Sequence, residues 1–213
     1  MKTTNLIKMH QHNLFGKKII RSISFNEQEI IRDILYLHCN NNPIECDATY
    51  STGNFYKKGL TKPKYKFDIA PQSTEVVKAC STNLPLDNSS INVLMFDPPF
   101  MFEKRKRENQ NIMNKRFTMY NNGFKELKHH YKKSLLEFSR VLKPKGILIF
   151  KCQDYTDSKT TLTHTYVYKW AKKVGFYAKD LFILLSRGAI ANKNLNQRHA
   201  RKYHSYFYVF QNR

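Results

Sequence analysis

Short apolar runs separated by polar stretches recur along this chain of 213 residues. Runs that are rich in β-branched and aromatic side chains predict buried strands. The predicted strands are residues 44–47, 65–69, 76–79, 91–97, 146–151, 181–186 and 203–210. Apolar residues at helical spacing predict helices over 163–174 and 130–142, the second with Leu135, Leu136, Phe138 and Val141 facing inward. A further helix is predicted after a capping box, Ser24-Phe25-Asn26-Glu27.

Strands that alternate with helices are typical of a doubly wound α/β fold, in which most strands of one sheet run parallel. The pattern therefore predicts a mostly parallel, seven-stranded sheet. The last strand, 203–210, is expected to run antiparallel to 181–186. A chain of this length can bury one sizeable core. We expect one domain over residues 1–213, with a basic N-terminal segment and helix at 1–42 and a basic insertion at 101–130.

The charge of the chain points to a polyanionic partner. There are 37 Lys and Arg against 16 Asp and Glu, which gives a formal net charge of +21. Such an excess favours nucleic acid or an anionic membrane surface. No apolar run is long enough to span a bilayer, and residues 1–5 lack the apolar stretch of a signal peptide. We therefore expect a cytoplasmic protein that binds nucleic acid and no membrane.

The cysteines and histidines do not indicate a metal site. Cys39, Cys46, Cys80 and Cys152 are scattered and form no Cys-x-x-Cys pair, so reduced thiols are expected and no metal is predicted. The adjacent His129 and His130 also lack nearby partner ligands. They are expected at the surface or facing nucleic acid.

The tetrapeptide Asp97-Pro98-Pro99-Phe100, directly after the predicted strand 91–97, can present a distinctive surface. Two prolines end the ladder, stiffen the turn and remove two backbone N–H donors. An exocyclic aromatic amine suits what remains, because Asp97 and the Pro98 carbonyl can accept its two hydrogens while Phe100 stacks on the ring. The alternative is an ordinary turn, in which Asp and Pro are common.

This tetrapeptide resembles the catalytic motif of the S-adenosylmethionine-dependent amino-methyltransferases that act on adenine N6 or cytosine N4 of DNA. Further segments resemble that family in the same order along the chain: 44–55, 67–69, 79–86 and 141–151. The resemblance implies a Rossmann-like fold and a base-flipping methylase that uses S-adenosyl-L-methionine. It also implies a bacterial or phage-encoded enzyme, either part of a restriction-modification pair or an orphan methylase.

The resemblance implies a cofactor site at the carboxyl ends of three strands, where ligands bind in such sheets. Asp47, Thr49 and Gly53 would hold the methionine part. Asp68 would accept from both ribose hydroxyls, because one carboxylate offers two acceptor oxygens. The adenine would contact Ile69, Asn83 and Cys80, the last of which replaces the acidic residue frequent in relatives. The family's glycine-rich loop keeps only Gly53, so a non-methylating nucleic-acid-binding module remains an alternative.

Basic residues flank the expected mouth of this site. Candidate phosphate contacts are Lys104, Arg105, Lys106 and Arg107 after the catalytic strand, and Arg198, Arg201 and Lys202 before the last strand. By family tendency, an Asp at the start of the tetrapeptide favours adenine over cytosine as the target base. DNA is the preferred substrate over RNA. An RNA base methyltransferase remains the alternative. The short insertion cannot hold a large recognition domain, so a homodimer or a partner recognition subunit is a further possibility.

Overall fold

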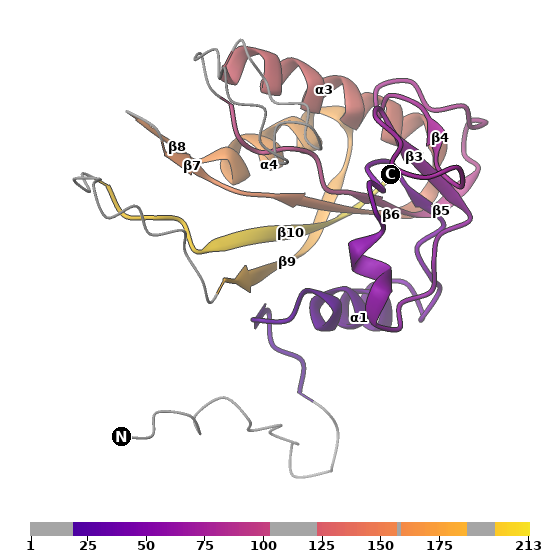
Figure 1. Cartoon of the computed structure of the whole chain (residues 1–213), viewed down its shortest axis with the longest axis horizontal. Helices are drawn as coiled ribbons and strands as arrows, with labels where there is room; N and C mark the ends of the chain where they lie inside the picture. The colour runs from indigo at the N-terminus through magenta and orange to yellow at the C-terminus, as the bar shows by residue number, and fades with distance from the viewer. Residues whose placement is uncertain (1–18, 103–122, 157–158, 187–198) are drawn as a thin grey trace.

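The computed structural model describes residues 19–102, 123–156, 159–186 and 199–213. One eight-stranded sheet crosses the molecule in the order β1-β9-β10-β6-β5-β2-β3-β4 (Figure 1). Its strands are β1 (Ile23–Ser24), β2 (Cys46–Asp47), β3 (Tyr65–Asp68), β4 (Val77–Lys78), β5 (Ile91–Phe96), β6 (Leu142–Cys152), β9 (Tyr177–Leu185) and β10 (His204–Gln211). A separate hairpin pairs β7 (Tyr155–Thr156) with β8 (Thr160–Thr161).

The sheet is mostly parallel, as predicted. The pairs β1–β9, β5–β6, β2–β5, β2–β3 and β3–β4 are parallel, and β10 runs antiparallel to both β9 and β6. The chain therefore has a Rossmann-like α/β fold with an antiparallel C-terminal strand. The predicted count of seven strands was one short, because β1 adds an edge strand through pairing of Ile23 with Ile183 and Ser24 with Leu184.

The same edge strand corrects the predicted start of the first helix. Ser24 lies in β1 and does not cap α1 (Glu27–His38); the N-cap is Asn26, whose side chain accepts from the backbone N–H of Glu29 at 3.2 Å. Ser24 instead donates its hydroxyl hydrogen to the Glu29 carboxylate at 2.6 Å. A two-residue strand carries too little periodicity to be recognised in the sequence.

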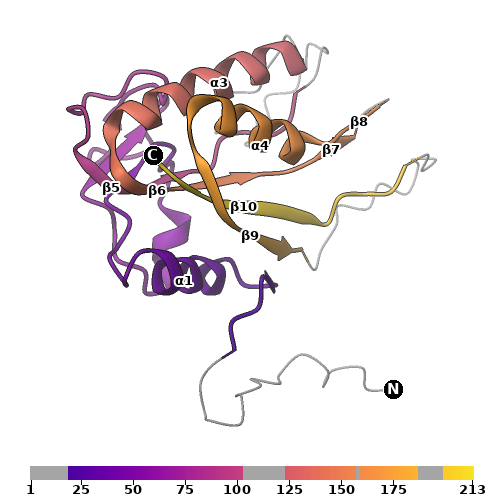
Figure 2. The same cartoon turned by 180° about the vertical axis from the view of Figure 1, so that it is seen from behind.

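Helices cover both faces of the sheet (Figures 1 and 2). On one face lie α3 (Phe124–Val141) and α4 (Thr163–Val174), and on the other lies α1, next to the short 3₁₀ helix η1 (Asn54–Lys58). The bounds of α4 match the prediction. Helix α3 begins six residues before the predicted 130, so the end of the expected insertion at 101–130 is helical. Leu136 was predicted to face inward but is 59% exposed.

Each central strand contributes to two hydrophobic layers, because successive side chains of a strand point to opposite faces. In β5 and β6, Leu94, Phe96, Leu148 and Phe150 pack under α3 and α4. Their neighbours Val93, Met95, Ile147 and Ile149 pack toward α1 and η1. Burial on both faces explains why these strands read as continuous apolar runs. It also holds the strand ends, where the candidate site lies, at fixed positions.

Candidate active site

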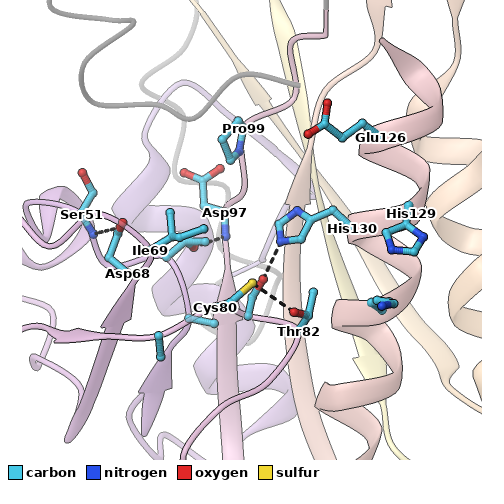
Figure 3. A pocket seen from close by; sticks show the side chains of 15 residues that line it. Ser51, Asp68, Ile69, Cys80, Thr82, Asp97, Pro99, Glu126, His129 and His130 are labelled. Carbon is cyan, nitrogen blue, oxygen red and sulfur yellow. Dashed lines mark hydrogen bonds between the residues drawn. The ribbon is translucent and has the colours of Figure 1, made fainter. Parts of the chain in front are cut away.

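A cavity of about 350 Å³ opens at the carboxyl ends of β2, β3 and β5. This volume lies within the range of small-molecule sites. In Figure 3, Ser51, Asp68 and Ile69 lie on one side of it, His129, His130 and Glu126 of α3 lie on the other, and Asp97 lies between them. Segments that are far apart in the sequence therefore meet at the sheet edge where parallel α/β folds bind ligands.

The loop after β2 is built around the fully buried Asp47. Its carboxylate accepts from the Thr49 backbone N–H at 2.9 Å and from the Tyr56 hydroxyl at 2.8 Å. Burial raises the pKa of Asp47 to about 7, although both hydrogen bonds act to lower it. Thr49 in turn accepts from the Asp97 backbone N–H at 2.8 Å through its hydroxyl. Asp47 therefore shapes the loop that fixes the start of the tetrapeptide.

Gly53 allows this loop to close. Its φ of +64° lies in the left-handed region, and a Cβ built on it would lie 2.5 Å from the Tyr50 hydroxyl oxygen. The Tyr50 ring stacks on Tyr56 with centroids 5.4 Å apart, so it cannot easily move aside. Gly53 thus supports the loop through its lack of a side chain and does not line the cavity.

Asp68 ends β3 with both carboxylate oxygens turned toward loop backbone. One oxygen accepts from the Ser51 N–H at 2.9 Å and the other from the Ala70 N–H at 2.8 Å (Figure 3 shows the Ser51 bond). Each oxygen has a second lone pair that can accept another hydrogen. The neighbouring Ile69 is 52% exposed and lines the cavity, so an apolar surface stands beside the carboxylate.

Asp97 differs from the other two strand-end carboxylates because it contacts a cation. Its Oδ2 atom lies 3.1 Å from Lys151 Nζ, in β6. Its Oδ1 atom is buried and has no hydrogen-bond partner among the residues that the structure describes. Burial raises the pKa of Asp97, while Lys151 opposes that shift and Glu27 adds to it. Among the described residues, the site thus holds one carboxylate oxygen that lacks a donor.

The turn after Asp97 is held from α3. Tyr131, which is fully buried, donates its hydroxyl hydrogen to the Pro99 carbonyl at 2.9 Å. Pro98 is buried, and Pro99 lines the cavity. Phe102 packs against Phe124 and Tyr155, with centroids 5.4 and 4.7 Å away. The chain on both sides of Phe100 is therefore anchored.

One stripe of α3 forms a cavity wall that the sequence reasoning missed. Glu126, His129, His130 and Lys133 follow helical spacing and all line the cavity. His130 shares a hydrogen bond of 2.9 Å with the Ser81 hydroxyl, and burial lowers the pKa of His130 to about 4. His129 and His130 both line the pocket: His129 is exposed, in line with the predicted surface position, whereas His130 is partly buried, and contact with nucleic acid stays a prediction. Their helical spacing relative to Glu126 and Lys133 was the available signal.

Helix α3 also fixes the segment between β4 and β5. Ser81 bonds the Ser134 hydroxyl at 2.9 Å, and the Leu84 backbone N–H donates to the Glu137 carboxylate at 2.7 Å. Burial raises the pKa of Glu137, but bonds from Arg140 and Leu84 outweigh it and the net shift is downward. The cavity wall at Cys80 and Ser81 is therefore rigid.

The structure brings six predicted site residues to the cavity: Thr49, Asp68, Ile69, Cys80, Asp97 and Pro99. It leaves others behind or beside the wall: Asp47, Gly53, Asn83, Pro98 and Phe100. Asn83 pairs with Cys80 through an isolated β-bridge. The roles proposed for these residues in the sequence remain predictions.

The predicted phosphate contacts divide between described and undescribed parts of the chain. Lys104, Arg105, Lys106, Arg107 and Arg198 lie outside the described residues. Arg201 and Lys202 precede β10, which is antiparallel to β6 and places Tyr206 opposite Cys152. The Lys202 carbonyl accepts from the Gln153 side chain at 3.3 Å. These two basic residues therefore lie at the sheet edge where β6 ends.

Two features are absent from the described part of the chain. None of its helices is long and apolar enough to cross a membrane. Within the same residues, no group of three or more His, Cys, Asp or Glu side chains could hold a metal ion.

No protein-family model and no curated protein matches this chain. Among solved structures, a possible exported protein of Bordetella parapertussis is similar, with 10% identity, a TM-score of 0.50, and coverage of 86% of this chain and 66% of that one. TTHA0409 of Thermus thermophilus, complexed with S-adenosyl-L-methionine, matches with 11% identity, a TM-score of 0.39, and coverage of 60% and 49%. The cytosine-N4-specific PvuII DNA methyltransferase matches with 19% identity, a TM-score of 0.44, and coverage of 63% and 48%.

The likeness to the Bordetella protein shows the fold alone, because the identity is low, and the other two, with TM-scores under 0.5, support no further conclusion. The chain spans about half the length of TTHA0409 and of the PvuII enzyme. Function must therefore be argued from the site.

Proposed function

We propose that this chain is an S-adenosylmethionine-dependent methyltransferase that acts on an exocyclic amine of a nucleic-acid base, with adenine N6 of DNA as the favoured target. The observation that carries the proposal is Asp97 Oδ1, a buried oxygen without a hydrogen-bond donor in the described residues, at a cavity that also contains Asp68 and Ile69. A buried acceptor without a donor is costly. An amine N–H of the substrate would satisfy it.

The residues around the cavity fit the cofactor. Asp68 would accept from two ribose hydroxyls with its remaining lone pairs, Ile69 would pack on the adenine ring, and Cys80 and Thr49 would complete the wall. When bound, the cofactor supplies a methyl group that is already activated by its positively charged sulfur. The nearby carboxylates of Asp68 and Asp97 suit that charge.

Asp97 would orient the amine of the base. The lone pair of an exocyclic amine is delocalised into its ring, so the amine is a poor nucleophile. Acceptors at Asp97 Oδ1 and at the Pro98 carbonyl would draw both hydrogens out of the ring plane and turn the lone pair toward the methyl group. Alignment of this kind supplies much of the rate in a direct transfer.

The nucleic acid would contact the edge of the sheet around the cavity. The formal charge of +21 favours phosphate binding, and Arg201 and Lys202 lie where β6 ends. A base inside a duplex cannot enter a cavity of this kind, so it must be flipped out. Lys104, Arg105, Lys106, Arg107 and Arg198 stay predicted phosphate contacts, and recognition through a second copy or a partner subunit stays a prediction.

Nucleoside mass spectrometry tests the reaction directly. The protein is incubated with S-adenosylmethionine labelled at its methyl group and with duplex DNA, single-stranded DNA or structured RNA. Label in N6-methyl-2′-deoxyadenosine of DNA is expected. Label in cytosine would change the target base, and label in RNA alone would support the RNA alternative. No label with any substrate, in a sample that binds the cofactor, would refute the methyltransferase proposal.

Calorimetry on Asp68→Asn tests the cofactor site separately. Loss of charge-assisted bonds to hydroxyls should weaken S-adenosylmethionine binding by about 10-fold or more, since each such bond contributes roughly 1.5–3 kcal/mol. Glu75→Gln is the matched control, because it makes the same charge change at an exposed carboxylate that pairs with Lys62 and Lys66. Equal affinities of both variants would place the cofactor elsewhere.

A further inference from the structure

Lys151 occupies an unusual position beside the tetrapeptide. In the parallel pair β5–β6, Phe96 lies opposite Phe150, so the next residues, Asp97 after β5 and Lys151 within β6, lie side by side. The Lys151 ammonium lies 3.1 Å from Asp97 Oδ2 and 2.6 Å from Glu27 Oε1, in the first turn of α1. Its side chain is only 12% exposed. A buried cation is therefore shared by two carboxylates from different elements.

Aromatic rings enclose the same ammonium. The Phe55 centroid lies 5.2 Å from Lys151 Nζ, and the Phe207 centroid lies 5.5 Å away. Both distances are within the reach of a cation–π interaction. Burial lowers the pKa of Lys151, but Asp97 and Glu27 outweigh it and the net shift is upward, so the group stays charged. The rings and carboxylates restrict the ammonium to one position.

This enclosure divides the two oxygens of Asp97 between different environments. Oδ2 is held by Lys151, while Oδ1 is buried and has no partner in the described residues. A carboxylate that is fixed through one oxygen cannot rotate to satisfy the other within the protein. Asp97 lines the cavity, so a donor group of a ligand bound there could complete this carboxylate.

We propose that Lys151 is the positioning residue for Asp97, and that Glu27, which shares the lysine, weakens the effect of its positive charge on Asp97. The inference rests on the proposed function, because it assigns the device that presents Oδ1 to the amine. Lys151 would not touch the substrate. It would act by keeping Asp97 ionised and oriented, and it would connect α1 to the active site.

Several charged groups face Asp97 from the elements packed around it. Lys151 and Glu27 are in direct contact through the bridge. Asp47 at the end of β2 interacts with Asp97 through its charge. Across the cavity lie Asp68, Glu126, His129, His130 and Lys133. Lys151 contacts Asp97 directly, and Glu27 contacts Lys151. Lys151 should therefore lower the pKa of Asp97, and Glu27 should raise it.

The test measures kcat/KM against pH for wild type, Lys151→Met and Glu27→Gln. The acid limb of this profile reports the ionisation of a required group in the free enzyme. Removal of the positive charge in Lys151→Met should move the limb to higher pH by about 1–3 pH units, with a lower kcat and little change in KM for the cofactor. Removal of the negative charge in Glu27→Gln should move it to lower pH. Lys151→Arg should keep the limb near wild type.

A direct titration makes the result independent of activity. The ¹³C signal of the Asp97 carboxyl group, followed by NMR in the cofactor-free protein, should shift its midpoint upward in Lys151→Met and downward in Glu27→Gln. Movement of both midpoints in the same direction, or of neither, would overturn the positioning role. If Lys151→Met does not fold, Glu27→Gln and Lys151→Arg decide the question. Opposite shifts in a protein that transfers no methyl group would support the bridge and refute only the proposed function.

Discussion

Asp47 and Asp97 stand at equivalent places in the fold but have different surroundings. Asp47 ends β2, and Asp97 directly follows β5. These two buried, parallel strands are neighbours in the sheet. Asp47 accepts from Thr49 and Tyr56, contacts no cation in the described structure, and does not line the cavity. Asp97 contacts Lys151, leaves one oxygen without a donor among the described residues, and lines the cavity.

The difference shows that a carboxylate at a strand end is not by itself evidence of a ligand contact. Burial without a neighbouring cation raises the pKa of Asp47 to about 7, although its two hydrogen bonds favour the ionised form. Burial raises the pKa of Asp97 as well, but the Lys151 ammonium beside it opposes that shift and favours the ionised form. We infer that the first supports a loop and the second is suited to chemistry.

The largest expected effect is on catalysis. Asp97→Asn should reduce methyl transfer roughly 100-fold or more, because the amide carries no charge and its NH₂ group would face either the substrate amine or Lys151, both of which are donors. The isosteric Asp47→Asn should lose far less activity. Turnover with labelled cofactor gives the rates, and thermal unfolding shows whether both variants fold. Equal losses in the two variants would remove the distinction between these aspartates.

Gly53→Ala should destabilise the loop beside Asp47 by about 2–4 kcal/mol, since a left-handed alanine is strained and its Cβ would displace Tyr50. Gly59→Ala provides the matched control. Its φ of +85° is also left-handed, but nothing lies within 4 Å of a Cβ there, so strain alone should cost about 1–2 kcal/mol. Urea unfolding gives both values. A Gly53 variant no less stable than the Gly59 variant would contradict the contact with Tyr50.

Tyr56→Phe should lower the free energy of unfolding by about 1–3 kcal/mol, because it removes a donor from the buried Asp47 carboxylate. Tyr36→Phe makes the same chemical change at a side chain that is 61% exposed, and should alter stability by less than about 0.5 kcal/mol. Denaturant unfolding of the two variants at one pH compares them. A similar small loss in both would mean that Asp47 does not depend on Tyr56.

The last comparison concerns the pH dependence of stability. The pKa of Asp47 is raised from 3.8 to about 7 in the folded state. Between these values the folded state binds more protons, so this contribution to stability is complete below the lower value and is lost as pH rises through about 7. Asp47→Asn removes the group. Its stability relative to wild type should therefore improve from pH 5 to pH 8 in unfolding experiments, and a constant difference would contradict a protonated Asp47.

Much of the fold could be predicted because strong periodicity survives in long, buried segments. Helix α4 matches its predicted range, and the antiparallel final strand was expected. The weak points were local. Strand β1 is only two residues long, and the start of α3 at Phe124 lies in a stretch where basic residues obscure the helical pattern. Leu136 fits the apolar pattern but lies on the solvent side of α3.

The candidate site was only partly predictable for a different reason. Asp68 and Asp97 could be found from strand ends and from the tetrapeptide. Lys151 stood out only as part of a family-like segment, and Glu27 only as part of a cap. Their contact joins residues 124 positions apart in the chain. Sequence spacing carries no information about such a pair until the parallel pairing of β5 with β6 and the packing of α1 are known.

The sequence by itself determined the α/β architecture, the strong positive charge and the rigid acidic turn at Asp97–Phe100. These properties depend on local periodicity, composition and the conformational limits of proline. Only the tertiary structure decided that Asp68 and Asp97 line the cavity, that Asp47 is hydrogen-bonded within its own loop, and that Asp97 contacts a lysine. Those outcomes depend on desolvation and on distances between atoms, and both arise only when distant segments pack together.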